Sequence, residues 1–179
     1  MARQTNGTLH STGFRFLCAS CVLAAGTVTT SRNAHAASAS ASLSVSAAVA
    51  NNCTISTTAL AFGTYDPVVA QASADLDGTG SVTIACTKGA STTIGLGLGS
   101  NPSGATRRLG DGASNFLNYE VYMDSVRATV WGNSGAALLT PPAAPSKGAR
   151  SFTVYGRIVG NQDVPAGSYT DTVTATVNF

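Results

Sequence analysis

The stretch Ser168-Tyr-Thr-Asp-Thr-Val-Thr-Ala-Thr-Val-Asn-Phe179 decides the fold that we predict for this chain. Its residues alternate between two faces, and alternation of this length with many β-branched residues indicates a β-strand that buries one face. The expected buried face holds Tyr169, Asp171, Val173, Ala175, Val177 and Phe179. Pro165 and Gly167 predict the turn that precedes the strand. The sequence holds no later strand to pair with this one, so we expect an open sheet edge, which invites a partner.

The rest of the chain carries short alternating segments separated by turns rich in glycine and proline. With the final strand they make seven strand candidates, at residues 60–67, 82–86, 94–98, 117–123, 128–131, 152–158 and 168–179. The intervening residues 71–80, 101–114 and 132–149 are predicted loops. Because no stretch has the 3.6-residue periodicity of a helix, we predict an all-β sandwich.

Residues 1–36 have the pattern of a secretory signal peptide. Arg3 and Arg15 flank a polar segment, residues 16–27 form an apolar run too short to span a bilayer, and Ala34-His35-Ala36 is an A-x-A cleavage signal. A disordered cytosolic N-terminus is the alternative. Cys18 and Cys21 lie in the apolar run and would be removed with it. We therefore expect export to the periplasm and beyond.

Cleavage after Ala36 leaves residues 37–179, which are 143 residues and suit one domain. Both histidines and three of the ten basic residues lie in the removed segment, which leaves seven basic against eight acidic residues. This near-neutral balance does not favour nucleic acid as a partner. No other apolar run is long enough for a membrane span.

Two cysteines remain in the mature chain, Cys53 and Cys86. An even number of cysteines in an exported protein predicts a disulfide, and a zinc site would need further ligands. We expect Cys53 and Cys86 to form one disulfide, with two free thiols as the alternative.

The N-terminal segment of the mature chain, residues 37–52, is rich in alanine and serine, which is typical of a flexible linker. Within it, Leu43, Val45, Ala47 and Val49 alternate with small polar or apolar residues, which is a strand pattern with one apolar face. The two interpretations, strand and linker, stay open at this point.

Several short motifs resemble catalytic or ligand-binding sites, but each lacks a required part. Gly95-Leu-Gly97-Leu-Gly99 lacks the spacing and the helix of a phosphate-binding loop. The stretch Asp75-Leu-Asp77-Gly78-Thr-Gly80 resembles the start of a calcium loop, but its twelfth position is Cys86 instead of Glu. We predict a solvated turn there, no metal and no cofactor.

We also predict no catalytic residues. A Ser-His-Asp or Cys-His arrangement cannot form in a mature chain that has no histidine. The candidates for a catalytic pair of carboxylates are Asp111, Glu120 and Asp124, which we interpret as surface charges. The candidates for an aromatic sugar-binding platform are Tyr122, Trp131 and Tyr155, which we interpret as core or rim residues. The protein is therefore not expected to be an enzyme.

At several places the chain resembles the spore coat protein U domain family. The similar segments are Cys53-Thr-Ile, Leu60-Ala-Phe-Gly-Thr-Tyr-Asp-Pro67, Val82-Thr-Ile-Ala-Cys86, Leu117-Asn-Tyr-Glu-Val-Tyr-Met-Asp124, Phe152-Thr-Val-Tyr-Gly-Arg-Ile158 and the end of the chain from Val164. The most specific part is the ending, Pro-x-Gly-x-Tyr-x-Asp-x-Val followed by alternation to Phe179. The resemblance covers nearly the whole mature chain. The family includes subunits of archaic chaperone–usher pili and a coat protein of bacterial spores.

The resemblance implies an incomplete immunoglobulin-like sandwich that lacks its final strand and is completed by donor-strand exchange. Residues 53–179 would be the pilin domain and residues 37–52 the donor segment. The donor positions would be Leu43, Val45, Ala47 and Val49. The acceptor groove, covered by a chaperone before assembly, would be lined by Tyr169, Val173, Ala175, Val177 and Phe179.

The function implied is that of a structural subunit of a surface pilus, a class of fibre that serves cell adhesion and biofilm formation. Its partners would be identical subunits in a homo-polymer, a periplasmic chaperone and an outer-membrane usher. A secreted coat protein, a binding module at a pilus tip and a self-complemented monomer, with residues 37–52 folded back, are the alternatives.

Overall fold

The computed structural model describes residues 36–179. The predicted signal peptide therefore lies outside the described residues except for its last residue, Ala36. Residues 36–52 form neither helix nor strand and are exposed, and every strand lies after them. Among residues 36–179, no helix is long and apolar enough to cross a membrane.

Seven strands and one turn of 3-10 helix make up the domain. The elements are β1 (Cys53–Ala61), β2 (Leu76–Cys86), β3 (Thr93–Leu96), β4 (Arg107–Gly110), β5 (Phe116–Tyr122), η1 (Gly135–Ala137), β6 (Arg150–Ile158) and β7 (Ala175–Asn178). The prediction of an all-β fold is confirmed.

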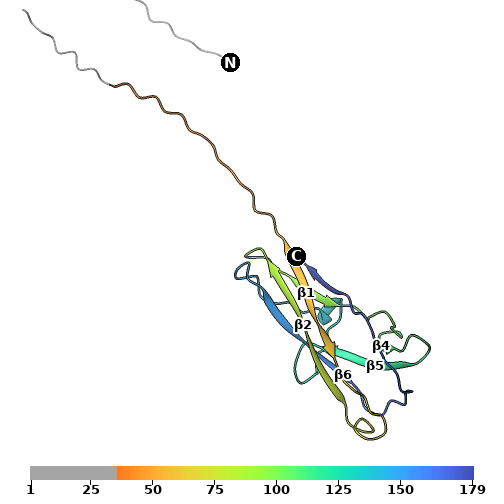
Figure 1. Cartoon of the computed structure of the whole chain (residues 1–179). Coiled ribbons are helices and arrows are strands. Elements are labelled where there is room, and N and C mark those ends of the chain that lie inside the picture. The colour runs from red at the N-terminus through yellow and green to blue at the C-terminus, as the bar shows by residue number, and fades with distance from the viewer. Residues whose placement is uncertain (1–35) are drawn as a thin grey trace, which may run out of the picture. The chain divides into compact units, whose positions relative to one another are not determined.

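The strands form two sheets around one core. The larger sheet is antiparallel with the order β1-β2-β6-β5-β4, and the smaller sheet pairs β3 with β7 (Figure 1). The core takes Val82 and Ile84 from β2, Ile94 from β3, and Val121 from β5, with Trp131 fully buried among them. Because both sheets supply residues to the same core, the domain is a two-layer sandwich.

β2 begins at Leu76, inside the predicted loop at residues 71–80. The solvated turn predicted at residues 75–80 is therefore wrong, because residues 76–80 pair with β6 as part of the strand. The strand boundaries differ from the predictions in four other places. The strand expected at residues 60–67 is instead the end of β1, because Gly63 (φ +82°) turns the chain away after Phe62. The predicted loop at residues 101–114 contains β4. The strand expected at residues 128–131 is reduced to a single bridge between Tyr122 and Val130.

The fourth difference concerns the stretch on which the fold prediction rests. Only Ala175–Asn178 form a ladder, although residues 169–177 alternate between half-buried and exposed as the pattern predicted. The reason is that residues 171–173 have no neighbouring strand among residues 36–179 with which to form a ladder. The prediction of which residues face inward is therefore confirmed, and the prediction that the whole stretch forms a strand is wrong.

Candidate functional site: a groove between two open sheet edges

β1 forms one side of the candidate site and has a free edge. It pairs with β2 from Cys53 opposite Cys86 to Thr58 opposite Ser81, and the register shifts before Ala61 pairs with Thr79. On its other side β1 has no strand partner among residues 36–179. The register shift between Thr58 and Ala61 is a β-bulge, which changes which side chains of β1 face the core. Free backbone groups along an edge strand are ready to pair with another chain.

Beyond the bulge, β1 leads into a part of the chain that packs tightly on the larger sheet. Leu60 and Phe62 both lie against Gly156 of β6. A Cβ added at Gly156 would lie 2.7 Å from atoms of Leu60 and of Phe62. Glycine is therefore required at this position for the two apolar side chains to reach the core.

The C-terminal segment, residues 164–175, forms the opposite side of the site. The hydroxyl of Tyr169 donates a hydrogen bond to the carbonyl of Pro165 at 2.9 Å. A tyrosine that bonds to the backbone a few residues upstream is the tyrosine corner of immunoglobulin-like sandwiches. Thr170 then pairs with Gly110 through two backbone hydrogen bonds, both of 2.9 Å. These contacts fix the segment to β4 on one side and leave its other side open.

Between these two sides lies an apolar groove. One cavity of about 300 Å³ has Thr57–Leu60 on one side and Asp171–Ala175 on the other. A second cavity of about 960 Å³ continues from it between residues 60–68 and residues 164–171. Leu60, Phe62, Leu109 and Asp171 line both cavities, so the two form one groove. Its floor is formed by residues of the larger sheet and β3, namely Leu96, Tyr119, Val121 and Val154.

A hydrogen-bonded pair gives the groove a polar point near its middle. The buried hydroxyl of Tyr119 donates to Asp171 Oδ2 at 2.6 Å, and Asp171 Oδ1 accepts the backbone N–H of Ser100 at 2.7 Å. Burial, followed by the hydrogen bond to Asp171, raises the pKa of the Tyr119 hydroxyl far above its usual range. The phenol therefore stays protonated and keeps the C-terminal segment tied to β5.

The residues predicted to line the acceptor groove do not all lie in it. Val173 and Ala175 line the first cavity and Tyr169 lines the second. Val177 packs against the core in the β3–β7 sheet, outside both cavities. Phe179 is 53% exposed.

The residues predicted as the donor strand are exposed. Leu43, Val45 and Val49 are 87%, 84% and 86% exposed, and Ala47 is exposed as well. The structure forms no strand in residues 36–52, so the expected strand pattern at residues 43–49 leaves these aliphatic side chains in solvent.

Comparison with known proteins identifies the family. A sequence profile of the Spore Coat Protein U domain matches residues 39–176. The chain belongs to the Spore Coat Protein U domain family. It is also similar to Protein U of Myxococcus xanthus, with 39% identity over 173 residues, which cover 89% of this chain and 96% of that protein.

A solved structure supports the fold of this Spore Coat Protein U domain. The match is to the crystal structure of the CsuC–CsuE chaperone–tip adhesion subunit pre-assembly complex from archaic chaperone–usher Csu pili of Acinetobacter baumannii. The TM-score is 0.55 at 24% identity, and the match covers 73% of this chain but only 40% of that chain. Together with the tyrosine corner, it confirms the predicted immunoglobulin-like sandwich.

A buried arginine links the two sheets of the Spore Coat Protein U domain, because Arg107 of β4 pairs with Glu120 of the neighbouring strand β5 and also binds a carbonyl of β3. Arg107 is 1% exposed and forms an ion pair with Glu120, which is 26% exposed. The Arg107 guanidinium also donates to the carbonyls of Leu96 and Trp131 at 2.9 and 2.8 Å, and its Nε donates to Gly97 at 2.9 Å. The interpretation of Glu120 as a surface charge was therefore wrong. No local pattern pointed to the ion pair, because Arg107 falls in a predicted loop.

The structure joins Cys53 at the start of β1 to Cys86 at the end of β2 by a disulfide. Beyond the disulfide, Thr87 holds the residues that precede β1. Its backbone N–H donates to the carbonyl of Asn52 at 2.9 Å, and its hydroxyl donates to the carbonyl of Ala50 at 3.2 Å. The point at which the chain enters the edge strand is thus fixed to the residue that follows the neighbouring strand β2.

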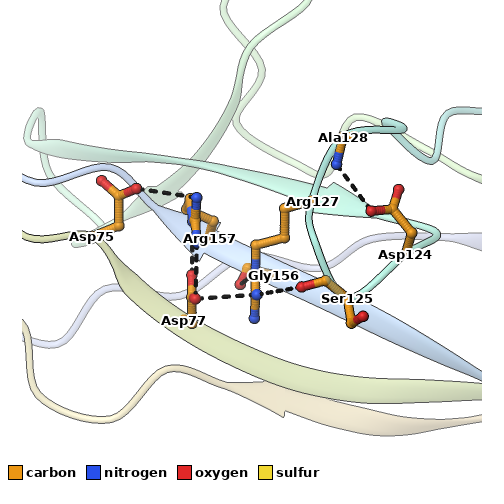
Figure 2. Close-up of polar contacts among 8 residues, drawn as sticks. All are labelled: Asp75, Asp77, Asp124, Ser125, Arg127, Ala128, Gly156 and Arg157. Carbon is orange, nitrogen blue, oxygen red and sulfur yellow. Dashed lines mark hydrogen bonds and ion pairs between the residues drawn. The ribbon is translucent and has the colours of Figure 1, made fainter.

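A cluster of ion pairs lies at the start of β2, where the calcium-loop motif was considered (Figure 2). Arg157 binds Asp77 through two hydrogen bonds of 2.8 and 3.0 Å and lies 3.2 Å from Asp75. Arg127 lies 3.1 Å from Asp77 and donates to the carbonyl of Gly156 at 3.1 Å. Because both aspartates are paired with arginines, they are not arranged to coordinate a cation. Among residues 36–179 there is no cluster of three metal-ligating side chains.

The remaining candidate residues do not converge on a site. Asp111 and Asp124 each cap a separate turn, through backbone hydrogen bonds from Ala113 and from Ala128 and Thr129. Hydrogen bonds from Asn115 and Ala113 lower the pKa of Asp111, and those from Ala128 and Thr129 lower the pKa of Asp124. Trp131 is fully buried, whereas Tyr122 and Tyr155 are half-buried opposite each other on β5 and β6.

Proposed function

We propose that this protein is a structural subunit of an exported surface fibre, polymerised by donation of residues 43–49 to the groove of the neighbouring subunit. The observation that carries the proposal is the open groove between β1 and the C-terminal segment, whose two sides lack strand partners among residues 36–179. A strand inserted there would complete the sandwich by strand addition.

The donor segment has the length of a β-strand and an apolar face that suits an apolar groove. Six residue steps separate Leu43 from Val49, which is about 20 Å of extended strand. Burial of Leu43, Val45 and Val49 would contribute about 1.5–3 kcal/mol each, with backbone hydrogen bonds in addition. Ala47 would contribute less, because it offers only a methyl group. The match to the Spore Coat Protein U domain begins at residue 39, so residues 43–49 lie inside the matched region.

The partners follow from the same geometry. A head-to-tail contact that does not close on itself produces a filament of identical subunits. Before assembly, the apolar groove needs a cover, and we propose a periplasmic chaperone that binds along the lining residues Tyr169, Val173 and Ala175, with an outer-membrane usher for export. The matched solved structure is itself a complex of a chaperone with a pilus subunit. Residues 1–36 would direct the chain to the periplasm. We propose no enzymatic activity.

A secreted coat protein is a second candidate function. It is favoured by the 39% identity to Protein U over 96% of that protein and by the description of the family as a spore coat domain. In such a protein the donor segment would fill its own groove, and the product would be a monomer or a coat layer without long filaments. Electron microscopy of the secreted material separates the two, because only the first candidate function yields fibres.

The decisive experiment tests the donor segment in cells that produce the chaperone and the usher. Deletion of residues 37–51 is expected to abolish fibres while leaving the subunit bound to the chaperone. Val45→Asp is expected to do the same, because it replaces a buried aliphatic side chain by a carboxylate in an apolar groove. Ser44→Asp is the matched control, since it adds the same charge on the opposite face of the strand. Fibres formed without residues 37–51 would contradict the proposal.

A further inference from the structure

The link between the proposed donor strand and the domain is very short, and this constrains how two subunits can meet. Only residues 50–52 separate Val49 from Cys53 at the start of β1. Four Cα steps span at most about 14 Å. Thr87 shortens the free length further, because it binds the carbonyls of Ala50 and Asn52. If the strand is donated as proposed above, the donating domain must therefore lie against the mouth of the acceptor's groove.

The groove has two mouths, and the geometry of a filament selects one of them. Its near mouth lies beside the start of β1 and the end of β7, which are close together at the C-terminus (Figure 1). Its far mouth lies between residues 65–68 and residues 164–167. The donor strand leaves each domain at the near end. Only entry through the neighbour's far mouth stacks the domains head to tail, whereas entry through the near mouth would bring two like ends together.

The far mouth carries an exposed apolar turn with a fixed conformation. Val68 and Val69 are 81% and 76% exposed. Their backbone N–H groups donate to Asp66 Oδ1 at 2.9 and 3.1 Å, and the side chain of Gln71 accepts the N–H of Asp66 at 2.8 Å. The carbonyl of Gln71 in turn accepts the N–H of Asn161 at 2.7 Å. A turn held by these bonds presents its two valines to solvent side by side in one fixed place.

The two ends of the domain carry opposite charges. Both lysines of the chain, Lys88 and Lys147, are exposed in the loops at the near end. These two loops are joined, because Ala144 exchanges backbone hydrogen bonds with the turn that follows Lys88. At the far end, Asp66 and the exposed Asp163 lie beside the valine turn and the groove mouth. A near end that meets a far end would thus place lysines against aspartates, which favours the head-to-tail pairing and disfavours contact of like ends.

We propose that consecutive subunits form a second contact outside the groove, between the Val68–Val69 turn of the acceptor and the basic end of the donor around Asn52, Thr87 and Lys88. The occupant of the valine turn is a second copy of this chain. The contact buries the exposed valines and fixes the angle between neighbouring domains, so that the filament resists bending at each junction. This inference rests on the proposed function, because it needs the donor strand in the groove.

The test is chemical cross-linking of assembled fibres. A chain with Val69→Cys and Lys88→Cys is assembled and treated with a short bis-maleimide, which reacts only with the introduced thiols while the Cys53–Cys86 disulfide is closed. Within one subunit the two sites are separated by the 11 residues of β2, or about 36 Å, so a cross-link must join two subunits. The expected result is a ladder of covalent multimers on a heated denaturing gel. Val68→Cys with Lys88→Cys is the second variant, for use if the first disturbs folding.

The matched control replaces Val69 by another valine of nearly equal exposure. Val126 is 78% exposed and lies in the turn of residues 124–128 that follows β5, beside the Arg127–Asp77 ion pair and outside the residues that line the groove. The Val126→Cys, Lys88→Cys chain is expected to give at least tenfold fewer multimers. Fibres that give equal ladders in test and control, or none with either test variant, would overturn the inference while the proposed function stands. Absence of fibres from the unsubstituted chain would refute the proposed function, and this inference with it.

Discussion

Removal of the Cys53–Cys86 disulfide should lower the free energy of unfolding of the domain by an amount that depends on the length of the loop it closes. The bond joins the first residue of the edge strand β1 to the last residue of β2. β1 is hydrogen-bonded on one side only among residues 36–179, so it depends more on a covalent tie than the inner strands β2, β6 and β5 do. The double variant Cys53→Ser, Cys86→Ser removes the disulfide and keeps small side chains at the two positions, which lie opposite each other in the β1–β2 ladder.

The expected loss follows from the length of the loop that the disulfide closes. A sequence separation of 33 encloses 34 residues. The entropy of closing such a loop in the unfolded chain corresponds to about 3.8 kcal/mol at 25 °C. With a urea m-value of about 2 kcal/mol/M, the midpoint of unfolding should fall by about 2 M. The m-value itself should rise slightly, because the unfolded chain without the cross-link is more expanded.

The assay is urea unfolding of the monomeric mature protein, residues 37–179, followed by far-UV circular dichroism. Each single Cys→Ser variant should lose about as much stability as the double variant, since either one opens the loop. The unsubstituted protein in a thiol-free reductant should match them. A loss below about 1 kcal/mol, or single variants whose effects add up in the double variant, would refute the reasoning, because the loop-closure term is present or absent as a whole.

Three further predictions concern stability. Arg107→Leu should lower the free energy of unfolding by about 3–5 kcal/mol, because it leaves one member of a buried ion pair and several carbonyls without a partner; the urea midpoint measures this. Hydrogen bonds from an arginine, an asparagine and backbone N–H groups lower the pKa values of Asp77, Asp111 and Asp124 below 3.8. The contribution of these carboxylates to the free energy of unfolding is therefore complete above about pH 4 and is lost as the pH falls through their folded-state pKa values. The urea midpoint should be constant from pH 5 to 7 and lower at pH 2.5. A midpoint that stays constant down to pH 2.5 would contradict this. Gly99→Ala should destabilise the domain, because φ is +85° there and the new Cβ would overlap a carboxylate of the C-terminal segment; calorimetry showing an unchanged Tm would contradict it.

The sequence was sufficient to predict the all-β class and the faces of the strands, because alternation reports burial directly. Tyr169, Val173 and Ala175 were placed on the inward face by parity alone, and the structure has them half-buried there. What alternation does not report is whether a strand has a neighbour. Residues 171–173 have the pattern of a strand and no ladder, since a ladder also depends on the chain beside them.

Sequence reasoning missed the buried arginine of the site for a physical reason. A polar side chain can be buried when buried hydrogen-bond partners surround it, and those partners can be distant in the sequence. Arg107 lies in a segment rich in glycine and polar residues that was predicted to be a loop. Its burial depends on carbonyls of β3 and of Trp131, which are distant in sequence and not visible in any local pattern. The tyrosine corner is different, because Pro165, Gly167 and Tyr169 carry a local signal from which the corner was predictable.

The buried polar contacts also explain how the groove stays open while it lacks a strand. A gap in an apolar core normally tends to close, since its walls gain contacts by moving together. Here the smaller sheet is held at a fixed distance from the larger one by groups that cannot shift without losing hydrogen bonds. Arg107 binds the carbonyls of Leu96 and Gly97, and the indole N–H of Trp131 donates to Ile94 at 2.9 Å.

These donors all act on β3, which carries β7 as its only ladder partner among residues 36–179. Fixing β3 therefore fixes the side of the groove that β7 and the residues before it form. The Tyr119–Asp171 bond fixes the same side nearer its middle. If this is how the groove is kept open, Arg107→Leu should lower the affinity for a peptide of residues 37–51 as well as the stability. Tyr119→Phe, which keeps the apolar floor, should lower the affinity by about tenfold through the loss of one charge-assisted bond. An unchanged affinity in both variants would show that the groove is held by the apolar packing alone.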